Sequence, residues 1–351
     1  MSVALAAAAR FSSAPGPAEV LGALRAIEAF EDLDVDRQRV ARLWRAGRAR
    51  VGLPLEAATP GFRAYATDEL EGCRRGRFPA FSITGGACAL DCDHCQAKIL
   101  QPMIPATRPD VLEREVRARA AAGDLAGFLL SGGSNRRNEV PFERFLPTIA
   151  RLKADLPDLR IAAHTGLVDR RRAERLAEAG VEVAMLDVIG AEATIREVYH
   201  LDRPVADFEA ALAALVATPL RVVPHVVIGL HYGRVLGEFR ALEIIARHRV
   251  DACILVVVMP AFTRARRFRA PDPGEVADVF LAARELLPQQ RVLLGCARPP
   301  GAPRRLIDAY ALLAGLDGIA FPAEGIVALA SALGRPLAQA HACCSIGSRR
   351  C

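Results

Sequence analysis

Three cysteines crowd a short stretch of the sequence, "ACALDCDHCQ" at residues 87–96. Cys88, Cys92 and Cys95 have the spacing C-x3-C-x2-C, with no fourth cysteine nearby. A structural zinc site normally has four protein ligands, and His94, directly beside Cys95, is poorly placed to reach the same ion. Thiolates also select iron–sulfur clusters, and a cubane has four irons to ligate. Three cysteines would leave one iron open to a substrate, as an incomplete ligand shell does in a catalytic zinc site.

The remaining six cysteines fall into a group near the carboxyl terminus and three single positions, namely Cys343, Cys344 and Cys351, and Cys73, Cys253 and Cys296. A chain without a secretory signal uses cysteine for metal or redox chemistry before disulfides. Cys253, inside the apolar run "ACILVVVMP", is expected to be a small buried hydrophobe. The adjacent pair Cys343–Cys344, together with Cys296, predicts a second iron–sulfur site. The alternative is that the terminal cysteines are disordered and incidental.

The elements that must position these cysteines alternate along the chain. From Phe78 onward, eight short apolar runs are separated by longer amphipathic stretches. Continuous apolar strands between helices indicate a parallel sheet covered on both faces, and eight such units fit a (β/α)8 barrel. We expect an α/β fold with a helical extension over residues 1–76, a TIM-type barrel over 77–326 and a cysteine-bearing tail over 327–351 that can fold back over the top of the barrel. A doubly wound open sheet is the alternative.

The barrel interpretation places chemistry at the carboxyl ends of the strands. Several polar or small residues occupy such positions, namely the cysteine triplet, Gly132–Gly133, His164, Asp187, the segment from His225 to Gly229, Met259 and Cys296. Any one of them could be an ordinary turn, cap or packing residue. Their convergence on one rim favours a functional site there.

Composition limits the classes of partner. The chain is 52% hydrophobic with no run of 18 apolar residues, so we expect no membrane span. The net charge of +6 could suit nucleic acid, but arginines are spread evenly and aromatic residues make up only 5%, which favours an ordinary solvated surface. The opening "MSVALAAAARFSSAPGP" resembles a transit peptide slightly. The whole chain is rich in Ala and Arg, however, so we expect a cytoplasmic protein.

The C-x3-C-x2-C triplet after the first strand of a predicted α/β barrel resembles the signature of the radical SAM superfamily, and the resemblance extends from Phe78 to the carboxyl terminus. It implies that Cys88, Cys92 and Cys95 hold a [4Fe-4S] cluster. The open iron of that cluster would bind the amino and carboxylate groups of S-adenosylmethionine (SAM), and the reduced cluster would cleave SAM to a 5′-deoxyadenosyl radical. The position of His94 is usually aromatic in this family, so His94 is expected to shield the cluster.

The same resemblance assigns the SAM contacts. Gly132–Gly133 resemble the turn that contacts the methionine amino group, although Ser134 stands where many members carry Glu. Ile228–Gly229 resemble the adenine-contacting segment, and Asp187 is a candidate for the ribose hydroxyls.

A narrower resemblance is to the two-component lipoyl synthases, within the group that is similar to biotin and lipoyl synthases. It rests on the strings "SITGGACALDCDHC", "LLSGGSN", "AHTGL", "LDVIG", "PHVVIGL", "LGCARPPG" and "ACCSIG". It implies sulfur insertion into an unactivated C–H bond of a carrier-bound octanoyl chain. Cys296, Cys343 and Cys344 would be catalytic and hold an auxiliary iron–sulfur cluster, with Cys73 or Cys351 as a fourth ligand. Single-chain lipoyl synthase places its auxiliary cysteines ahead of the barrel, where this chain has only Cys73.

The resemblance also implies partners. These are an octanoylated lipoyl-carrier protein or domain, a second radical SAM subunit, and a reduced ferredoxin or flavodoxin as electron donor. Such carriers tend to be acidic, which suits the arginine excess. Three alternatives stay open, namely another radical SAM reaction such as biotin synthase-like sulfur insertion or methylation, a non-catalytic iron–sulfur partner subunit, and a zinc-binding structural protein.

Overall fold

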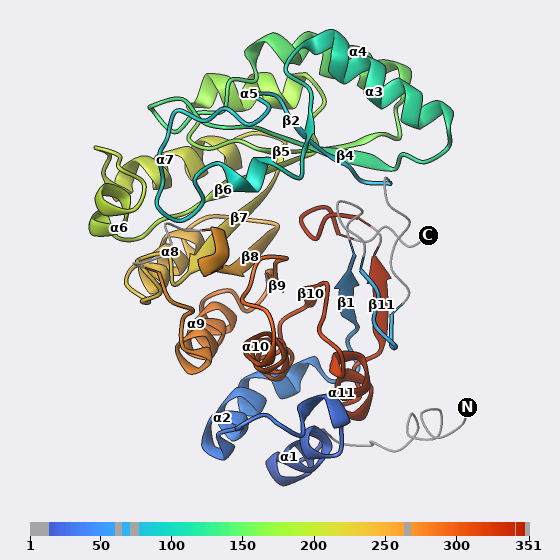
Figure 1. The fold of residues 1–351 in the computed structure, drawn as a ribbon, viewed down its shortest axis with the longest axis vertical. Helices are drawn as coiled ribbons and strands as arrows, with labels where there is room; N and C mark the ends of the chain where they lie inside the picture. Colours follow the sequence, from blue (N-terminus) through green and yellow to red (C-terminus); the bar gives the residue numbers. More distant parts are fainter. Residues whose placement is uncertain (1–13, 60–64, 71–76, 263–267, 341, 348–351) are drawn as a thin grey trace.

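One parallel sheet organises the molecule. The computed structural model describes residues 14–59, 65–70, 77–262, 268–340 and 342–347. Its eleven strands have the order β11-β1-β10-β9-β8-β7-β6-β5-β4-β2-β3, and every neighbouring pair is parallel. Figure 1 shows the sheet curled into a half-barrel with the helices outside it. The predicted α/β fold of the barrel type is confirmed, but β11 and β3 are two edges, so the sheet is open.

All eight predicted strands form. They are β2 (Ala80–Ser82), β4 (Gly127–Ser131), β5 (Arg160–His164), β6 (Val183–Asp187), β7 (Arg221–Ile228), β8 (Ala252–Val257), β9 (Arg291–Leu294) and β10 (Gly318–Ala320). Three further strands extend the sheet, namely β1 (Leu55–Ala58), β3 (Ile104–Pro105) and β11 (Leu337–Ala340).

Helices cover the outer face of the sheet. Between the strands lie α3 (Pro109–Ala121), α4 (Leu146–Asp155), α5 (Arg170–Glu178), α6 (Glu192–Glu197), α7 (Val205–Val216), α8 (Glu238–Ala246), α9 (Pro273–Leu286), α10 (Ala302–Leu313) and α11 (Ile326–Ala332). Short 3-10 turns are η1 (Glu28–Phe30), η2 (Arg48–Arg50), η3 (Lys98–Leu100), η4 (Glu143–Phe145) and η5 (Pro260–Phe262). The larger apolar cluster fills the space between strands and helices. Within the described part of the chain, no helix has the length and apolar character needed to span a membrane.

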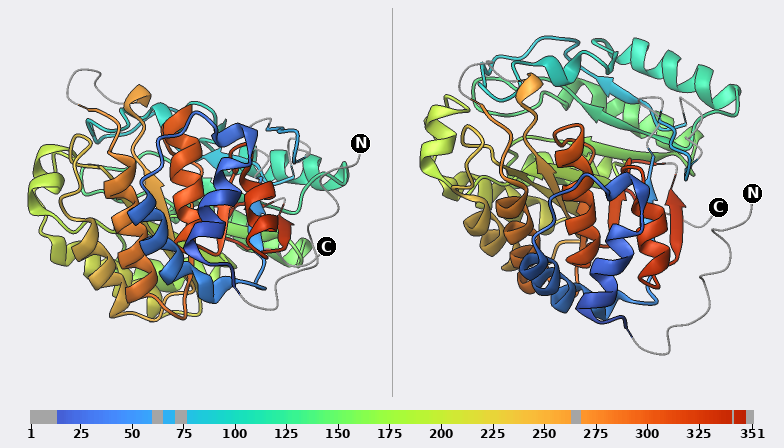
Figure 2. Two further views of the ribbon diagram at one scale, coloured as in Figure 1. Left: turned by 90° about the horizontal axis from the view of Figure 1, so that it is seen from below. Right: turned by 60° about the horizontal axis from the view of Figure 1, so that its bottom comes forward.

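The amino-terminal region is only partly the helical extension that the sequence predicts. Helices α1 (Pro17–Arg25) and α2 (Arg37–Gly47) form as expected and pack beside α9, α10 and α11 (Figure 2). The prediction of helix is wrong for Leu55–Ala58, because these residues form strand β1, which pairs with both β10 and β11. All four residues of β1 are buried, so the tertiary pairing overrides the helix-favouring composition "LEAA".

A second, smaller apolar cluster lines the inside of the curl. No α-helix among the described residues contributes to it; its members come from alternate positions of the strands, such as Ala162, Val183 and Val223. Residues 342–347 also lie here, with Cys344 and Ile346 in the cluster. The carbonyl oxygen of Ile346 accepts hydrogen bonds from the first residues of β5 and β7. The segment follows the carboxyl end of β11, which is parallel to β1. The sequence predicts that it folds over the top of the barrel; residues 342–347 instead run down the inside of the curl, so that Ile346 lies at the amino ends of β5 and β7.

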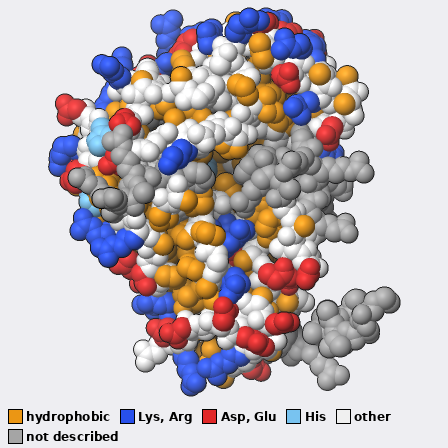
Figure 3. Space-filling view, viewed as in Figure 1, with side chains coloured by type: hydrophobic (Ala, Val, Ile, Leu, Met, Phe, Trp, Pro, Cys, Tyr) orange, Lys and Arg blue, Asp and Glu red, His pale blue; other side chains and the backbone are white. Residues whose placement is uncertain are grey.

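The outer surface mixes charges. On the face in Figure 3, basic and acidic side chains lie over the helices at both ends of the view, and hydrophobic side chains gather between them.

Candidate active site

The cysteine triplet lies on the loop that follows β2, at the carboxyl end of that strand. Cys92 is buried, while Cys88 and Cys95 are half-buried. The thiols of Cys92 and Cys95 share a hydrogen bond, and the charge of Cys88 acts on Cys92. The predicted metal ligands are therefore brought together by a single loop.

The turn after β4 packs directly against Cys88. Gly133 comes so close that a Cβ atom there would lie 2.6 Å from the Cα of Cys88 and 2.0 Å from the carbonyl oxygen of Ala87. Ser134 continues the contact, since its carbonyl oxygen accepts a hydrogen bond from the backbone N–H of Ala89 at 2.8 Å and lies 3.8 Å from the Cys88 Sγ. Only glycine allows this approach, so the predicted Gly132–Gly133 turn lies against the cysteine loop.

The segment around Tyr199 braces the other side of the loop. The ring of His94 stacks on Tyr199 with centroids 4.7 Å apart, and the Cys92 Sγ lies 3.9 Å from the Tyr199 carbonyl oxygen. Asp93 is buried, and its carboxylate contacts His200 Nε2 at 3.1 Å and the hydroxyl of Tyr232 at 3.2 Å. The loop is thus held by two contacts: its own Asp93 carboxylate binds residues outside the loop, and the ring of Tyr199 stacks on it.

Backbone strain concentrates at this loop. Gln96 and Ala97, which follow Cys95, have φ of 48° and 57°, and His200 and Tyr232, which contact the loop, have φ of 56° and 55°. Non-glycine residues rarely adopt these angles, and such strain persists where surrounding contacts enforce it, often at functional sites. The strain therefore supports a functional role for the loop.

The chemistry of the three thiols fits an iron–sulfur cluster. The hydrogen bond from the Cys92 thiol lowers the pKa of Cys95 to about 4, and the same bond together with burial raises the pKa of Cys92. Three neighbouring thiolates repel one another, so full deprotonation of the set requires a bound cation such as iron. The residues present thus suit the group that the sequence implies.

A polar band crosses the inner face of the sheet next to this loop. His164 ends β5, Asp187 ends β6, and His225 is the register partner of Asp187 on β7. One ligand atom from each lies within 4.8 Å of the others, with His164 Nε2 at 3.5 Å from Asp187 Oδ1. The hydroxyl of Tyr199 donates to Asp187 Oδ2 at 3.4 Å. The band therefore connects the cysteine loop to the interior of the curl.

Electrostatics set the protonation of the band. Burial opposes ionisation of Asp187, but the hydrogen bond and charge of His164 prevail and lower its pKa to about 2. Burial and the nearby His164 lower the pKa of His225 to about 4. The band thus presents a carboxylate and a neutral imidazole at pH 7, groups that can accept hydrogen bonds from hydroxyls.

The other predicted cysteines meet inside the curl. Cys344 is buried and Cys296 and Cys343 are half-buried, and all three belong to the inner cluster. The hydrogen bond from the Cys344 thiol lowers the pKa of Cys343 to about 6, and the charge of Cys296 acts on Cys344. His164 acts electrostatically on Cys343. The second group of thiols therefore lies near His164 of the polar band, while the cysteine loop contacts the band through Tyr199.

A buried ion pair anchors the loop that carries Cys296. Arg298 and Asp308 are 3% and 0% exposed, and Arg298 Nη2 donates to Asp308 Oδ2 at 2.8 Å. Arg298 Nη1 also donates to the carbonyl oxygen of Gly295 at 2.7 Å, directly before Cys296. The ion pair thus fixes the backbone at Cys296.

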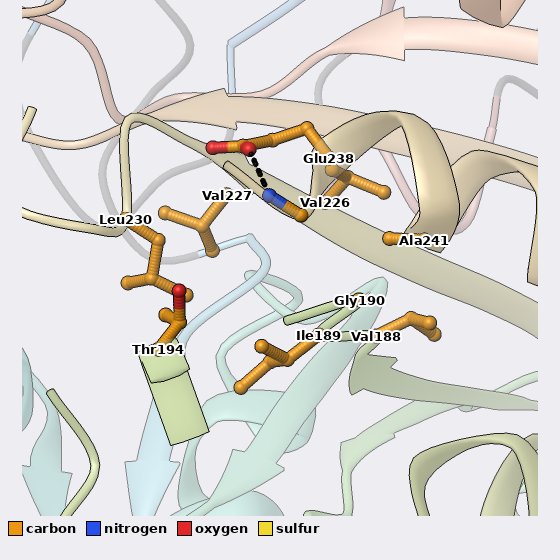
Figure 4. Close-up of a pocket in the computed structure, with 10 residues that line it drawn as sticks. Val188, Ile189, Gly190, Thr194, Val226, Val227, Leu230, Glu238 and Ala241 are labelled. Carbon is orange, nitrogen blue, oxygen red and sulfur yellow. Dashed lines mark hydrogen bonds between the residues drawn. The ribbon is translucent and has the colours of Figure 1, made fainter. Parts of the chain in front are cut away.

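The predicted adenine-contacting residues lie apart from the inner face. Ile228 is fully buried in the outer cluster, on the strand face opposite His225, so only its backbone is available to a ligand. Gly229 has φ of 77°, and its N–H donates to Glu238 Oε1 at 2.8 Å. A mainly apolar hollow lies beside it, lined by residues that follow β6, by β7 and by the start of α8 (Figure 4).

Three other cysteines complete the inventory. Cys253 is fully buried in the outer cluster, and burial raises its pKa to about 12, as expected of an inert core thiol. Cys73 and Cys351, the two candidates for a fourth auxiliary ligand, lie outside the described residues.

Sequence reasoning missed the role of Tyr199, which links the cysteine loop to Asp187. Tyr199 lies in the short segment after α6, where no periodicity or spacing marks it. His164 and His225 were visible as polar residues within apolar runs, but their contact with Asp187 depends on the register of three strands.

A cysteine triplet at the carboxyl end of a strand in a curled parallel α/β sheet is the arrangement that suits an iron–sulfur site in an enzyme of the barrel type. Residues 82–234 match the family model described as the Radical SAM superfamily. This stretch is therefore a radical SAM superfamily domain, and that family implies a [4Fe-4S] cluster and SAM as cofactors. A search of curated proteins found no match.

Solved structures share the fold. Methylornithine synthase (PylB) superposes with a TM-score of 0.55 at 14% identity, over 88% of this chain and 83% of that one. HydG, a maturase of the [FeFe]-hydrogenase, gives 0.56 at 12% identity over 87% and 68% of the two chains. HydG from Carboxydothermus hydrogenoformans gives 0.53 at 16% identity over 87% and 69%. At these identities the likeness establishes the fold alone.

Proposed function

We propose that this chain is a radical SAM sulfurtransferase that inserts sulfur into an unactivated C–H bond of a carrier-bound octanoyl chain, as a component of a lipoyl synthase. The observation that carries the proposal is the convergence of Cys296, Cys343 and Cys344 inside the curl, across the polar band from the cysteine triplet. Two separate thiol groups facing one space suit a reaction that needs a radical source and a sulfur source.

The chain's residues divide the work. Cys88, Cys92 and Cys95 hold the first cluster, and Cys296, Cys343 and Cys344 hold the second. When bound, the first cluster and SAM supply the 5′-deoxyadenosyl radical that removes a hydrogen atom, and the second cluster supplies the sulfur. Asp187 would accept hydrogen bonds from the ribose hydroxyls of SAM, and the hydroxyl of Tyr199, which donates to Asp187 Oδ2, would orient that carboxylate.

The apolar lining protects the reaction. Inward-facing side chains such as Val183, Met185 and Val223 are almost fully buried and offer no exchangeable hydrogen. Such an apolar interior keeps water away from a carbon-centred radical. The substrate is an octanoylated lipoyl-carrier domain or a peptide from one, and a second radical SAM subunit and a ferredoxin or flavodoxin donor complete the system.

The test compares cluster content with product. Wild type, Cys343→Ala/Cys344→Ala and the control Cys253→Ala are reconstituted without oxygen, and their iron and sulfide are counted. Each is then incubated with SAM, a reductant and an octanoyl-lysyl peptide. We expect wild type and the control to release 5′-deoxyadenosine and thiolate the peptide, with loss of sulfide. The double variant should release 5′-deoxyadenosine without thiolation.

Three outcomes would contradict the proposal. Release of 5′-deoxyadenosine by fully loaded wild type with no thiolated peptide would favour another radical SAM reaction. Equal iron content in wild type and the double variant would show that Cys343 and Cys344 hold no second cluster. No release of 5′-deoxyadenosine at all would favour a non-catalytic partner subunit.

A further inference from the structure

Three arginines ring the amino end of the curled sheet. Arg160, Arg221 and Arg291 are the first residues of β5, β7 and β9. Each shares the inner face with apolar residues two positions on, namely Ala162, Val223 and Leu293. Arginines at the start of three strands therefore point to the same side of the sheet as the second group of cysteines.

Two of these arginines hold the carboxyl-terminal segment. Arg160 Nη2 and Arg221 Nη1 both donate to the carbonyl oxygen of Ile346, at 3.0 and 3.1 Å. Arg160 Nη1 donates to the carbonyl oxygen of Gly347 at 3.2 Å. Hydrogen bonds from charged donors are stronger than neutral ones, and two guanidinium groups on one oxygen fix its position in space. The backbone at Ile346–Gly347 is thus attached to two strands.

Acidic partners orient the arginines. Glu182 Oε1 and Oε2 accept from Arg160 at 2.8 and 3.1 Å, and Glu182 Oε1 lies 3.4 Å from Arg221 Nη1. Arg291 Nη2 donates to Glu56 Oε2 at 2.9 Å, and Glu56 is 6% exposed. An arginine side chain that a carboxylate already holds loses less rotamer freedom when it binds the carbonyl groups of the segment.

The attached backbone lies next to the two thiols. The N–H of Ile346 donates to the carbonyl oxygen of Cys343 at 2.9 Å, which closes a turn over residues 343–346. The hydroxyl of Ser345 donates to Cys343 Sγ at 3.1 Å. The side chain of Ile346 is 1% exposed and packs in the inner cluster with Cys344. A short rigid turn therefore transmits the position of Ile346 to both thiols.

We propose that Arg160 and Arg221 are positioning residues that seat segment 342–347 as a floor in the amino end of the curl, and so hold Cys343 and Cys344 opposite Cys296. The reason why these thiols must be held rests on the proposed function. The seating itself does not, and can be measured without any cluster.

The first test is thiol labelling of the protein without iron. A maleimide reagent is applied to reduced wild type and to Arg160→Gln/Arg221→Gln, and modification of each cysteine is followed by mass spectrometry. We expect Cys343 and Cys344 to label at least about tenfold faster in the variant, because loss of charge-assisted hydrogen bonds favours release of the segment. Cys253, fully buried in the outer cluster, reports global unfolding and should stay unlabelled.

Two further variants guard against misfolding and nonspecific charge effects. Gly347→Ala keeps Arg160 and Arg221, but an alanine is strained at the φ of 70° that this position adopts, so we expect the same faster labelling. Arg117→Gln removes an exposed arginine paired with Glu113 and Asp155 on the outer surface, and should label like wild type. A wild-type labelling rate in Arg160→Gln/Arg221→Gln would overturn the proposal, whatever the rate in Gly347→Ala.

The second test separates this proposal from the proposed function. After reconstitution, Arg160→Gln/Arg221→Gln should lose the iron of the second cluster and keep the cubane that responds to SAM. If Cys343→Ala/Cys344→Ala loses that iron and the arginine variant keeps it, the proposal that the arginines position the segment is wrong, and the assignment of the second cluster is supported. A further outcome is that labelling accelerates in the arginine variant while wild type binds iron at the first site only. The seating of segment 342–347 by the two arginines would then be supported, and the proposed function would fail.

Discussion

The close approach of Gly133 to the cysteine loop gives the sharpest prediction about the first cluster. In Gly133→Ala, the new methyl group would lie 2.0 Å from the carbonyl oxygen of Ala87 and 2.6 Å from both Cα and Cβ of Cys88. Ordinary van der Waals contact begins at 3.4 Å. All three contacts are with backbone or with the ligand residue itself, so no flexible side chain can move aside.

The expected magnitude follows from that overlap. The turn after β4 and the cysteine loop must separate until the 2.0 Å contact reaches about 3.4 Å, whereas metal sites tolerate errors in ligand distance of only about 0.2 Å. Cys88 would therefore leave the ligand set. Overpacking of this kind costs about 1–3 kcal/mol of unfolding free energy, which a folded domain of this size can absorb. We expect a folded protein that binds little iron at the first site.

The assay counts iron after oxygen-free reconstitution of Gly133→Ala, with circular dichroism to verify folding. Gly86→Ala is the matched control, because Gly86 lies in the same loop region with nothing within 4 Å of an added Cβ. The control should load like wild type. A Gly133→Ala protein with a full, SAM-responsive cubane would refute the argument that this glycine sets the position of Cys88.

Two further predictions concern the buried charges. Asp308→Asn leaves Arg298 buried without its countercharge and should lower the free energy of unfolding by about 3–5 kcal/mol in urea denaturation. The control is Asp110→Asn, which breaks the exposed pair with Arg108 and should leave the free energy of unfolding nearly unchanged. Equal losses in the two variants would contradict the argument. The pKa of His225 is about 4 in the folded protein and 6.5 ordinarily, so the unfolded chain binds more protons between these values and stability falls as the pH falls through that window. The raised pKa of His164 opposes this loss, so the test compares the pH dependence of the free energy of unfolding in two proteins. From pH 6.5 toward 4, His225→Asn should lose less stability than wild type, by up to about 1.4 kcal/mol per pH unit. Parallel plots of unfolding free energy against pH would contradict the prediction.

The sequence was informative where a local pattern decides the structure. The eight apolar runs predict β2 and β4 to β10 because both faces of these strands are buried, and the cysteine spacing predicts the metal-binding loop because its ligands lie close in sequence. The strands β1 and β11 were missed because "LEAA" and "LAQA" have no β-favouring composition and form only by pairing with each other and with β10.

The site was predictable in its residue types and unpredictable in its assembly. Asp187 is visible at a strand end, but its contacts with His164 and Tyr199 require strand register and an irregular segment. The second cysteine group could be proposed from Cys343 and Cys344, whereas the attachment of the following backbone inside the curl involves Arg160 and Arg221, which are ordinary surface-type arginines in the sequence.

The central claim is that Cys88, Cys92 and Cys95 leave one iron of a cubane open to SAM. Electron paramagnetic resonance of the reduced, oxygen-free protein, recorded with and without SAM, tests it most directly. We expect a cubane signal that changes when SAM is added and that is lost in Cys92→Ala while any signal of the second cluster remains. A reduced protein with no cubane signal, or with one that SAM leaves unchanged, would contradict the account.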